Sequence, residues 1–227
     1  MTDRETIGTE HTIVGVDPGV KDIAVAAPLS PHPDQPDAIY AGSCTVKGVL
    51  HGFRRRMNYL AEEGGEHWRG EAESLTELGE VLDQQVETAV EQVIAYSRGF
   101  EQPAIALEEC SYDAPTPLIK LVAGGTEPGH WILPRFGERL EEAAAEADIP
   151  LRRVDRDGSS KECHRCGGRV ETRWSSCIQC PDADCPVDTA DRDRNAAGVL
   201  ARRLDEQLGE DRCRDERTQP GTLEAVE

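Results

Sequence analysis

The N-terminal part of the chain contains short apolar runs, separated by turn residues, that predict strands. Residues 12–19, TIVGVDPG, form a β-branched run that ends in a Pro-Gly turn, which is typical of a buried strand. Residues 22–29 follow after a short turn and predict the second arm of a hairpin. Beyond a proline-rich loop, residues 38–46 predict a third strand.

The pattern then changes to a helical period. Apolar residues recur at steps of three and four and predict one long amphipathic helix: Leu75, Leu78, Leu82, Val86, Ala89, Val90, Val93 and Ile94. Residues 103–110, PAIALEEC, follow this helix and predict a strand parallel to the first. A second helix is expected over residues 131–147, with Pro134 near its first turn or at a kink, and residues 150–155 predict an edge strand.

The remaining chain holds a cysteine-rich segment, a predicted helix over residues 194–208 and a charged, patternless end. The order of strands and helices matches a mixed α/β fold of the ribonuclease H type, with a mixed sheet and flanking helices. The expected divisions are a disordered N-terminus 1–11, a core 12–160, an inserted zinc ribbon 161–186, a final helix 187–208 and a disordered acidic tail 209–227.

Composition limits the functional classes less than the motifs do. The chain has 227 residues, 37% of them hydrophobic, which is ample for a core. Its net charge is −19, with 44 Asp and Glu against 25 Lys and Arg. Such acidity alone argues against a nucleic-acid partner. However, acid-rich and lysine-poor surfaces also keep proteins of salt-loving organisms soluble, so the charge leaves the partner open.

Neither a secretory signal nor an apolar run approaching ~18 residues is visible in the sequence, so we expect no membrane span and a cytoplasmic location. In that compartment, clustered cysteines are more typical of metal ligands than of disulfides.

Two CxxC pairs predict a metal site. They are CHRC, with Cys163 and Cys166, and CIQC, with Cys177 and Cys180. Two such pairs, joined by a hairpin-sized loop, can place four thiolates at the corners of a tetrahedron, as a zinc ribbon requires. Cys185 is an alternative to Cys180 as the fourth ligand, whereas His164 is expected to point outward and not to bind the ion. Four cysteine ligands leave no open coordination position, so this zinc is expected to be structural.

Three acids are candidates for a second metal site. Asp17 lies on the first strand, Glu108 lies on the strand expected beside it, and Asp193 opens the last helix. Two bare carboxylates about 4 Å apart repel each other by about 4 kcal/mol at an effective dielectric constant of 20, so such a cluster takes up protons or binds cations. Oxygen ligands favour Mg²⁺ or Mn²⁺, and two such ions can promote phosphodiester hydrolysis.

Simpler interpretations of these acids exist. An Asp before Pro-Gly, as at Asp17, is often a turn former, and Glu108 cannot be separated from Glu109 by position alone. Asp191 could be the N-cap of the last helix. The small residues Asn195, Ala196 and Ala197 would let that helix approach the sheet closely.

The ordered set of motifs resembles the TnpB family, the RuvC-type, RNA-guided nucleases of insertion sequences that are related to type V CRISPR effectors. The matching stretches are VGVDPGVKDIAV, IALEEC, SSKECHRCGG through CIQC, and DRDRNAAGVLARR. The resemblance implies a divalent-metal-dependent DNA endonuclease of the transposase type, with Asp17, Glu108 and Asp193 as its metal-binding catalytic acids. Glu108 matches the first acid of a Glu-Asp pair in the family, and here its neighbour is Glu109.

The resemblance also implies nucleic-acid partners. Family members carry a long N-terminal region that binds guide RNA and target DNA, and here the first motif begins almost at the start. We therefore expect DNA as a partner, with a guide RNA or a separate recognition subunit as further candidates. Arg54, Arg55 and Arg56 match a basic helix of the family that could contact a phosphate backbone, and an exposed helix face without a partner is the alternative interpretation. The acidic surface matches haloarchaeal members.

Two other functions remain open at this point. The chain could be a non-cleaving, zinc-ribbon nucleic-acid-binding or regulatory remnant of a transposase. It could also be a decayed transposon fragment without activity. Metal-dependent DNA cleavage that requires the three acids separates the nuclease from both.

Overall fold

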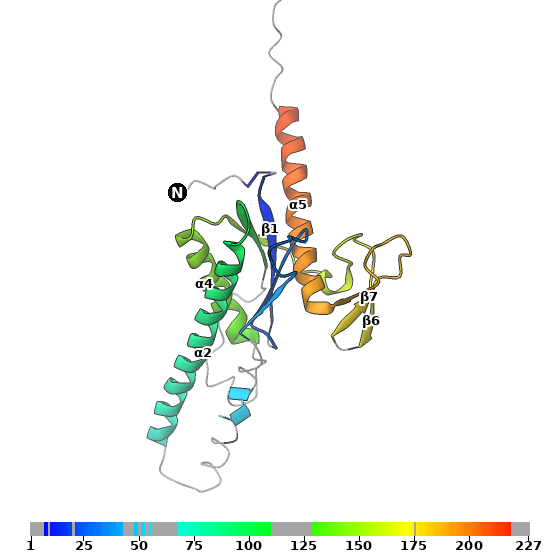
Figure 1. Cartoon of the computed structure of the whole chain (residues 1–227). Coiled ribbons are helices and arrows are strands. Elements are labelled where there is room, and N and C mark those ends of the chain that lie inside the picture. The colour runs from blue at the N-terminus through cyan, green and yellow to red at the C-terminus, as the bar shows by residue number, and fades with distance from the viewer. Residues whose placement is uncertain are drawn as a thin grey trace, which may run out of the picture.

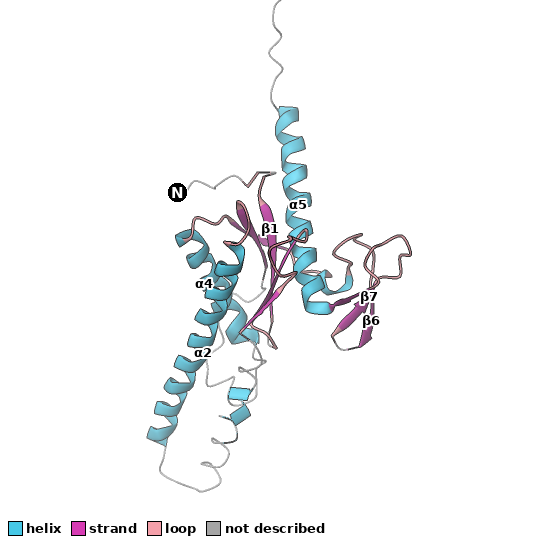
Figure 2. Ribbon diagram, viewed as in Figure 1, coloured by secondary structure: helices cyan, strands magenta, loops and turns pink. Residues whose placement is uncertain are grey.

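The computed structural model describes residues 7–8, 10–19, 21–42, 48–49, 51–52, 55, 68–109, 129–174 and 176–218. A five-stranded mixed sheet lies at the centre, with helices on both of its faces, and a three-stranded sheet lies to one side (Figures 1 and 2). This is the predicted mixed α/β architecture with flanking helices. None of the helices in the described residues combines the length and the apolar character that a bilayer span requires.

The large sheet has the strand order β3-β2-β1-β4-β5. Its strands are β1 Thr12–Pro18, β2 Ala24–Pro28, β3 Ile39–Ala41, β4 Pro103–Glu108 and β5 Leu151–Val154. The first three strands pair antiparallel, which confirms the predicted hairpin and third strand. Strand β4 pairs parallel to β1, and β5 pairs parallel to β4 at the edge, as predicted.

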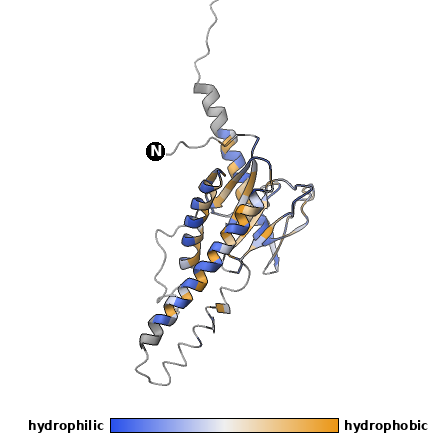
Figure 3. Cartoon of the chain, turned by 60° about the vertical axis from the view of Figure 1, so that its left-hand side comes forward, coloured by the Kyte–Doolittle hydropathy of each residue, from blue (hydrophilic) through white to orange (hydrophobic). Residues whose placement is uncertain are grey.

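Helices cover the two faces of this sheet unequally. Helices α2 Trp68–Ser97 and α4 Gly129–Glu146 pack together over one face, where Val14 and Val16 of β1 join the main apolar core. Helix α5 Arg192–Thr218 packs on the opposite face, against a smaller cluster that contains Ile13 of β1. The helices alternate hydrophobic and hydrophilic residues along their length (Figure 3), and burial of the hydrophobic ones stabilises the layered arrangement.

Helix α5 lies unusually close to β1 because Gly15 carries no side chain. A Cβ atom added to Gly15 would lie 1.8 Å from the carbonyl oxygen of Ala197 and 2.8 Å from the backbone nitrogen of Ala201. Ala197 is therefore one of the small residues that allow α5 to approach the sheet, as predicted. Its partner in strand β1 is Gly15. This contact fixes where α5 crosses the sheet.

The smaller sheet contains β6 Glu171–Trp174, β7 Cys177–Gln179 and β8 Thr189–Asp191, paired antiparallel in that order. The 3₁₀-helix η1, Ser159–Lys161, precedes this sheet and contacts α5. Strand β8 leads directly into α5, so the small sheet extends beyond the predicted end of the ribbon at residue 186.

Two predictions about the ends of the chain are wrong in part. Helix α5 continues to Thr218 instead of ending at residue 208, because its extension is rich in Glu and Arg, which favour helix without an apolar face. Near the N-terminus, Ile7 is buried against the α5 side of the sheet, although residues 1–11 were expected to be disordered. Residues 1–6 and 219–227 lie outside the described residues.

Candidate active site and metal centre

The first two candidate acids stand at the carboxyl ends of neighbouring parallel strands. Strands β1 and β4 pair in a register that places Val16 opposite Leu107, and Asp17 and Glu108 are the next residues along. Because side chains alternate across a sheet, both acids share the face of Gly15, which is covered by α5. Neighbouring parallel strands thus bring together two carboxylates that are far apart in the sequence.

Helix α5 brings the third acid to the same place. The carboxylate of Asp191 accepts hydrogen bonds from the backbone nitrogens of Asp193 (3.1 Å) and Arg194 (3.0 Å), so Asp191 is the N-cap, as one of the sequence interpretations proposed. Asp193 lies in the first turn, one turn before Ala197, which contacts Gly15. The Gly15 contact therefore also sets the position of Asp193.

The three carboxylates line one open cleft of about 710 Å³. Its wall also includes the loop from Arg156 through η1. Within the described residues, the carboxylates do not form a group as tight as that of the cysteines below, whose sulfur atoms all lie within 4.8 Å of one another. The cleft is large enough to admit ions or a substrate group beside its acids.

The acids interact electrostatically across this cleft. Burial, a hydrogen bond with Glu108 and the negative charges of Glu108 and Asp193 raise the pKa of Asp17 well above its ordinary value, and only Arg192 opposes this rise. The site therefore holds a proton at Asp17 more tightly than an isolated aspartate does. A bound cation would relieve the same repulsion.

Basic side chains, which sequence reasoning missed, accompany these acids. Arg156 pairs with Glu108 at 3.4 Å, Arg192 pairs with Asp193 at 3.2 Å, and Lys21 pairs with Asp22 at 3.6 Å. The cleft also includes Lys161, so two of the four lysines of this acidic chain line it. No motif spacing marks these basic residues in the sequence, because Lys21, the loop of Arg156 and the start of α5 meet only in the folded chain.

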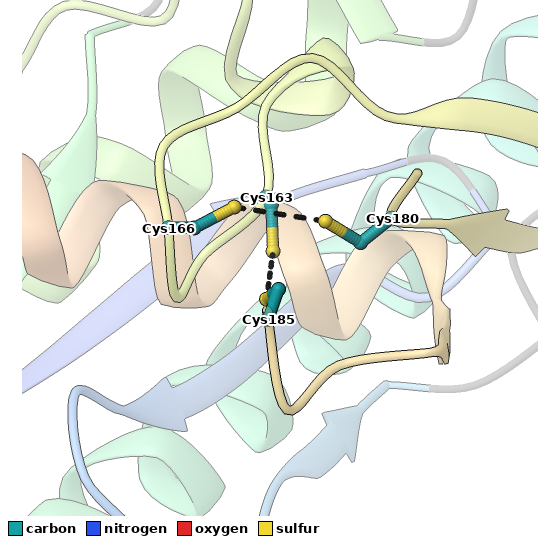
Figure 4. A group of neighbouring side chains, drawn as sticks. All are labelled: Cys163, Cys166, Cys180 and Cys185. Atoms are coloured by element: carbon teal, nitrogen blue, oxygen red, sulfur yellow. Dashed lines mark hydrogen bonds between the residues drawn. The ribbon is translucent and has the colours of Figure 1, made fainter. Parts of the chain in front are cut away.

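Four thiols form a separate cluster on the far side of the α5 N-terminus, in the segment of the small sheet. The sulfur atoms of Cys163 and Cys185 lie 3.7 Å apart, and those of Cys166 and Cys180 lie 3.6 Å apart (Figure 4). A tetrahedron with sulfur about 2.3 Å from a central Zn²⁺ has edges of about 3.8 Å, so the four thiols fit that ion. Burial raises the pKa of the Cys180 thiol to about 12, and a bound Zn²⁺ would lower it again.

Cys177 is not a member of this cluster, which corrects the predicted ligand set. Cys177 and Cys180 are three residues apart at the β7 strand, and an odd separation in extended chain places side chains on opposite faces. The Cys177 thiol instead contacts the carbonyl oxygen of Ile178 at 3.6 Å. The loop of residues 181–184 turns back and supplies Cys185 in its place, while Cys180 is retained.

His164 also differs from expectation, because it is buried and faces α5 instead of pointing outward. It does not belong to the thiol cluster, as predicted. Its ring contacts Asn195 and Arg194 of the first turn of α5. Of the three predicted phosphate-contacting arginines, Arg55 is exposed in a helical segment, and Arg54 and Arg56 lie outside the described residues.

Comparison with known proteins places these features in context. Residues 134–200 match the family model of the Cas12f1-like TNB domain, a stretch that contains the four thiols and Asp193. No curated protein sequence matches the chain. Among solved structures, Cas12f1 in a complex with sgRNA and target DNA superposes with a TM-score of 0.60 at 14% identity, covering 86% of this chain and 50% of that one.

The mini-RNA-guided endonuclease CRISPR-Cas_phi3 is a second structural neighbour, with a TM-score of 0.50 at 12% identity, covering 84% of this chain and 44% of that one. The family model matches residues 134–200 of the chain, and the two structures resemble most of it. At such low identity the two structural matches establish the fold alone. The chain spans about half the length of these structural neighbours.

Proposed function

We propose that the protein is a divalent-metal-dependent DNA endonuclease of the TnpB type, with Asp17, Glu108 and Asp193 as its cation ligands. The observation that carries this proposal is the convergence of three acids, distant in sequence, on one cleft, where their charges raise the pKa of Asp17. A cluster of like charges at the ends of parallel strands serves no evident purpose in folding, since it opposes the packing of α5. The relationship to Cas12f1 supports the same proposal.

The carboxylates fit hard cations because they offer only oxygen atoms, and Mg²⁺ or Mn²⁺ bound there would activate a water and stabilise the leaving oxygen of a phosphodiester. The three acids reach the cleft from two parts of the fold. Asp17 and Glu108 hold their oxygens in a fixed relation through the sheet. Asp193 approaches from α5, on the opposite side of the cleft from the strands.

The basic side chains of the cleft supply the second part of the mechanism. Arg156 and Arg192 neutralise Glu108 and Asp193 in this structure. When cations occupy the carboxylates, these guanidinium groups are free to bind the oxygens of a substrate phosphate. Lys21 and Lys161 also line the cleft, so its four basic side chains stand among five acids, and cations bound to the acids would make the cleft favourable for a DNA backbone.

The four thiols hold a structural Zn²⁺ in this proposal, because they leave no open coordination position. Nucleic-acid recognition is assigned to DNA, together with a guide RNA or a separate recognition subunit. The acidic surface is consistent with operation at high salt, where charge repulsion is screened.

DNA cleavage tests the proposal. We expect purified protein in high salt to cut single- or double-stranded DNA when Mn²⁺ is added, with and without co-purified RNA as separate arms. Asp17→Asn should abolish cleavage, whereas Asp157→Asn, which removes an exposed carboxylate from the rim of the same cleft, should not. Cleavage that persists in D17N would overturn the proposal, and tight DNA binding without any cleavage would favour a non-cleaving remnant.

A further inference from the structure

Asn195 connects the first turn of α5 to the segment that carries the thiols. Its side chain is fully buried. The amide oxygen accepts hydrogen bonds from the backbone nitrogen and from Nδ1 of His164, both at 3.0 Å, and the amide nitrogen donates to the carbonyl oxygen of Glu162 at 2.7 Å. Glu162 and His164 flank Cys163, so Asn195 holds the backbone on both sides of one thiol of the cluster.

The His164 ring is fixed by two neighbouring residues of α5. Its Nδ1–H donates to Asn195, and its Nε2 accepts a hydrogen bond from Arg194 at 2.6 Å. This pattern requires the neutral ring, which agrees with the direction in which burial shifts the pKa of His164, namely downward. Arg194 in turn lies 3.7 Å from the carboxylate of Asp37. Two consecutive residues of the helix thus bind one side chain of the thiol segment.

The thiol segment also lies directly against the helix backbone. A Cβ atom added to Gly198 would lie 2.8 Å from Cβ of His164, so no side chain fits between them. On its other side, the same part of α5 lies against Gly15 of β1 through Ala197. The first turns of α5 are therefore held between the sheet and the thiol segment.

We propose that Asn195 is a positioning residue through which the thiol segment fixes the location of Asp193 in the carboxylate cleft. Asp193 lies two residues before Asn195, in the turn that Asn195 anchors. The inference rests on the proposed function, because it assumes that Asp193 binds a cation. It implies that an intact thiol segment increases the affinity of the cleft for cations, although none of the described cysteines lines that cleft.

The test measures Mn²⁺ binding to the zinc-loaded full chain from the electron paramagnetic resonance signal of free Mn²⁺. We expect Asn195→Ala to weaken Mn²⁺ binding by roughly 10- to 100-fold, the range found when residues that orient metal ligands are removed. Arg202→Met is the matched control, because Arg202 also binds this segment, through Glu162 at 2.8 Å, but two turns further along α5. It should lower the thermal unfolding midpoint and leave the Mn²⁺ affinity within about twofold of wild type.

A second variant decides the question if N195A does not fold. Gly198→Ala removes no hydrogen-bonding group and improves helix propensity, yet it displaces His164 from the helix, so it should also weaken Mn²⁺ binding. Wild-type Mn²⁺ affinity in a folded N195A, or in G198A if N195A is unfolded, would overturn the inference.

Asp193→Asn separates this inference from the proposed function. If D193N weakens Mn²⁺ binding but neither N195A nor G198A does, the positioning role fails and the cation site stands. If D193N leaves Mn²⁺ binding unchanged, Asp193 is not a cation ligand, and both proposals fail for this residue.

Discussion

The thiol cluster and the carboxylate cleft lie on opposite sides of the same helix terminus, but the chain builds them in different ways. The thiols come from one short stretch between Cys163 and Cys185, where turns and a small sheet bring them together. The carboxylates come from β1, β4 and α5, which meet only when the large sheet has formed and α5 has packed on it. The first site is local and the second depends on the whole fold.

This difference determines how each site fails. A change in a single turn can remove the thiol cluster while the large sheet remains. The cleft, in contrast, depends on the backbone contact between Gly15 and Ala197, which joins the sheet to α5. The two sites share one property, which is a side chain with a raised pKa: Asp17 in the cleft and Cys180 in the thiol cluster. Each of these groups holds its proton more tightly than usual, and a bound cation would displace that proton.

The largest expected effect is the loss of Zn²⁺ affinity at the thiol cluster, which is the local site. Cys185→Ser should release Zn²⁺ to a chelator at concentrations that leave wild type loaded, with a loss of affinity of at least about 100-fold, because a direct ligand contributes more than the groups that orient it. Cys177→Ser is the matched control and should retain wild-type zinc content. Zinc loss in C177S with full loading in C185S would contradict the ligand set of the structure.

The second-largest expected effect is a loss of stability at the contact between α5 and β1, on which the carboxylate cleft depends. Gly15→Ala places a Cβ atom 1.8 Å from the carbonyl oxygen of Ala197, so it should lower the free energy of unfolding by about 3 kcal/mol, at the upper end of overpacking effects. Gly209→Ala, on the same helix, has nothing within 4 Å of the added atom and should leave stability unchanged or slightly increased. Urea denaturation of the two variants measures the contrast, and equal stabilities would refute it.

The smallest expected effect is a change of stability with pH, which tests the electrostatic interactions in the carboxylate cleft. The folded pKa of Asp17 is raised, so its contribution to stability is present below its ordinary value of 3.8 and is lost as the pH rises through the folded pKa. Without added Mn²⁺, and with the zinc retained, Asp17→Asn should therefore gain stability relative to wild type as the pH rises toward neutrality. Each tenfold change in proton affinity corresponds to about 1.4 kcal/mol.

Added Mn²⁺ provides the control for this experiment. It should stabilise wild type more strongly as the pH rises, because Asp17 must release its proton before it binds a cation, and it should stabilise D17N much less. A difference between D17N and wild type that stays constant across the pH range would show that Asp17 titrates normally.

The parts of the fold that follow from local pattern could be predicted from the sequence. Short apolar runs bounded by turn residues located the strands of the large sheet, and a helical apolar period located α2. The parallel pairing of β1 with β4 follows from the helix between them. That pairing is why the proximity of Asp17 and Glu108 could be predicted. The close approach of α5 could also be anticipated from its alanines, although its partner, Gly15, could not.

Two features of the thiol segment were not predicted from the sequence: the replacement of Cys177 by Cys185 and the burial of His164. The first depends on the local conformation of a motif, and the second depends on a tertiary contact. The spacing of Cys177 and Cys180 is that of a metal-binding turn, but these residues border a strand, so their side chains diverge and Cys185 replaces Cys177. The burial of His164 against Asn195 depends on how α5 packs on the thiol segment, and no periodicity in the sequence encodes that contact.

Mn²⁺ binding to wild type and two variants tests the central claim most directly, namely that the cleft acids hold divalent cations. Wild type should bind Mn²⁺, and Asp17→Asn should bind it at least about tenfold more weakly. Asp191→Asn should match wild type, since asparagine preserves the N-cap while removing a nearby charge. Equal Mn²⁺ affinities in wild type and D17N would contradict the account.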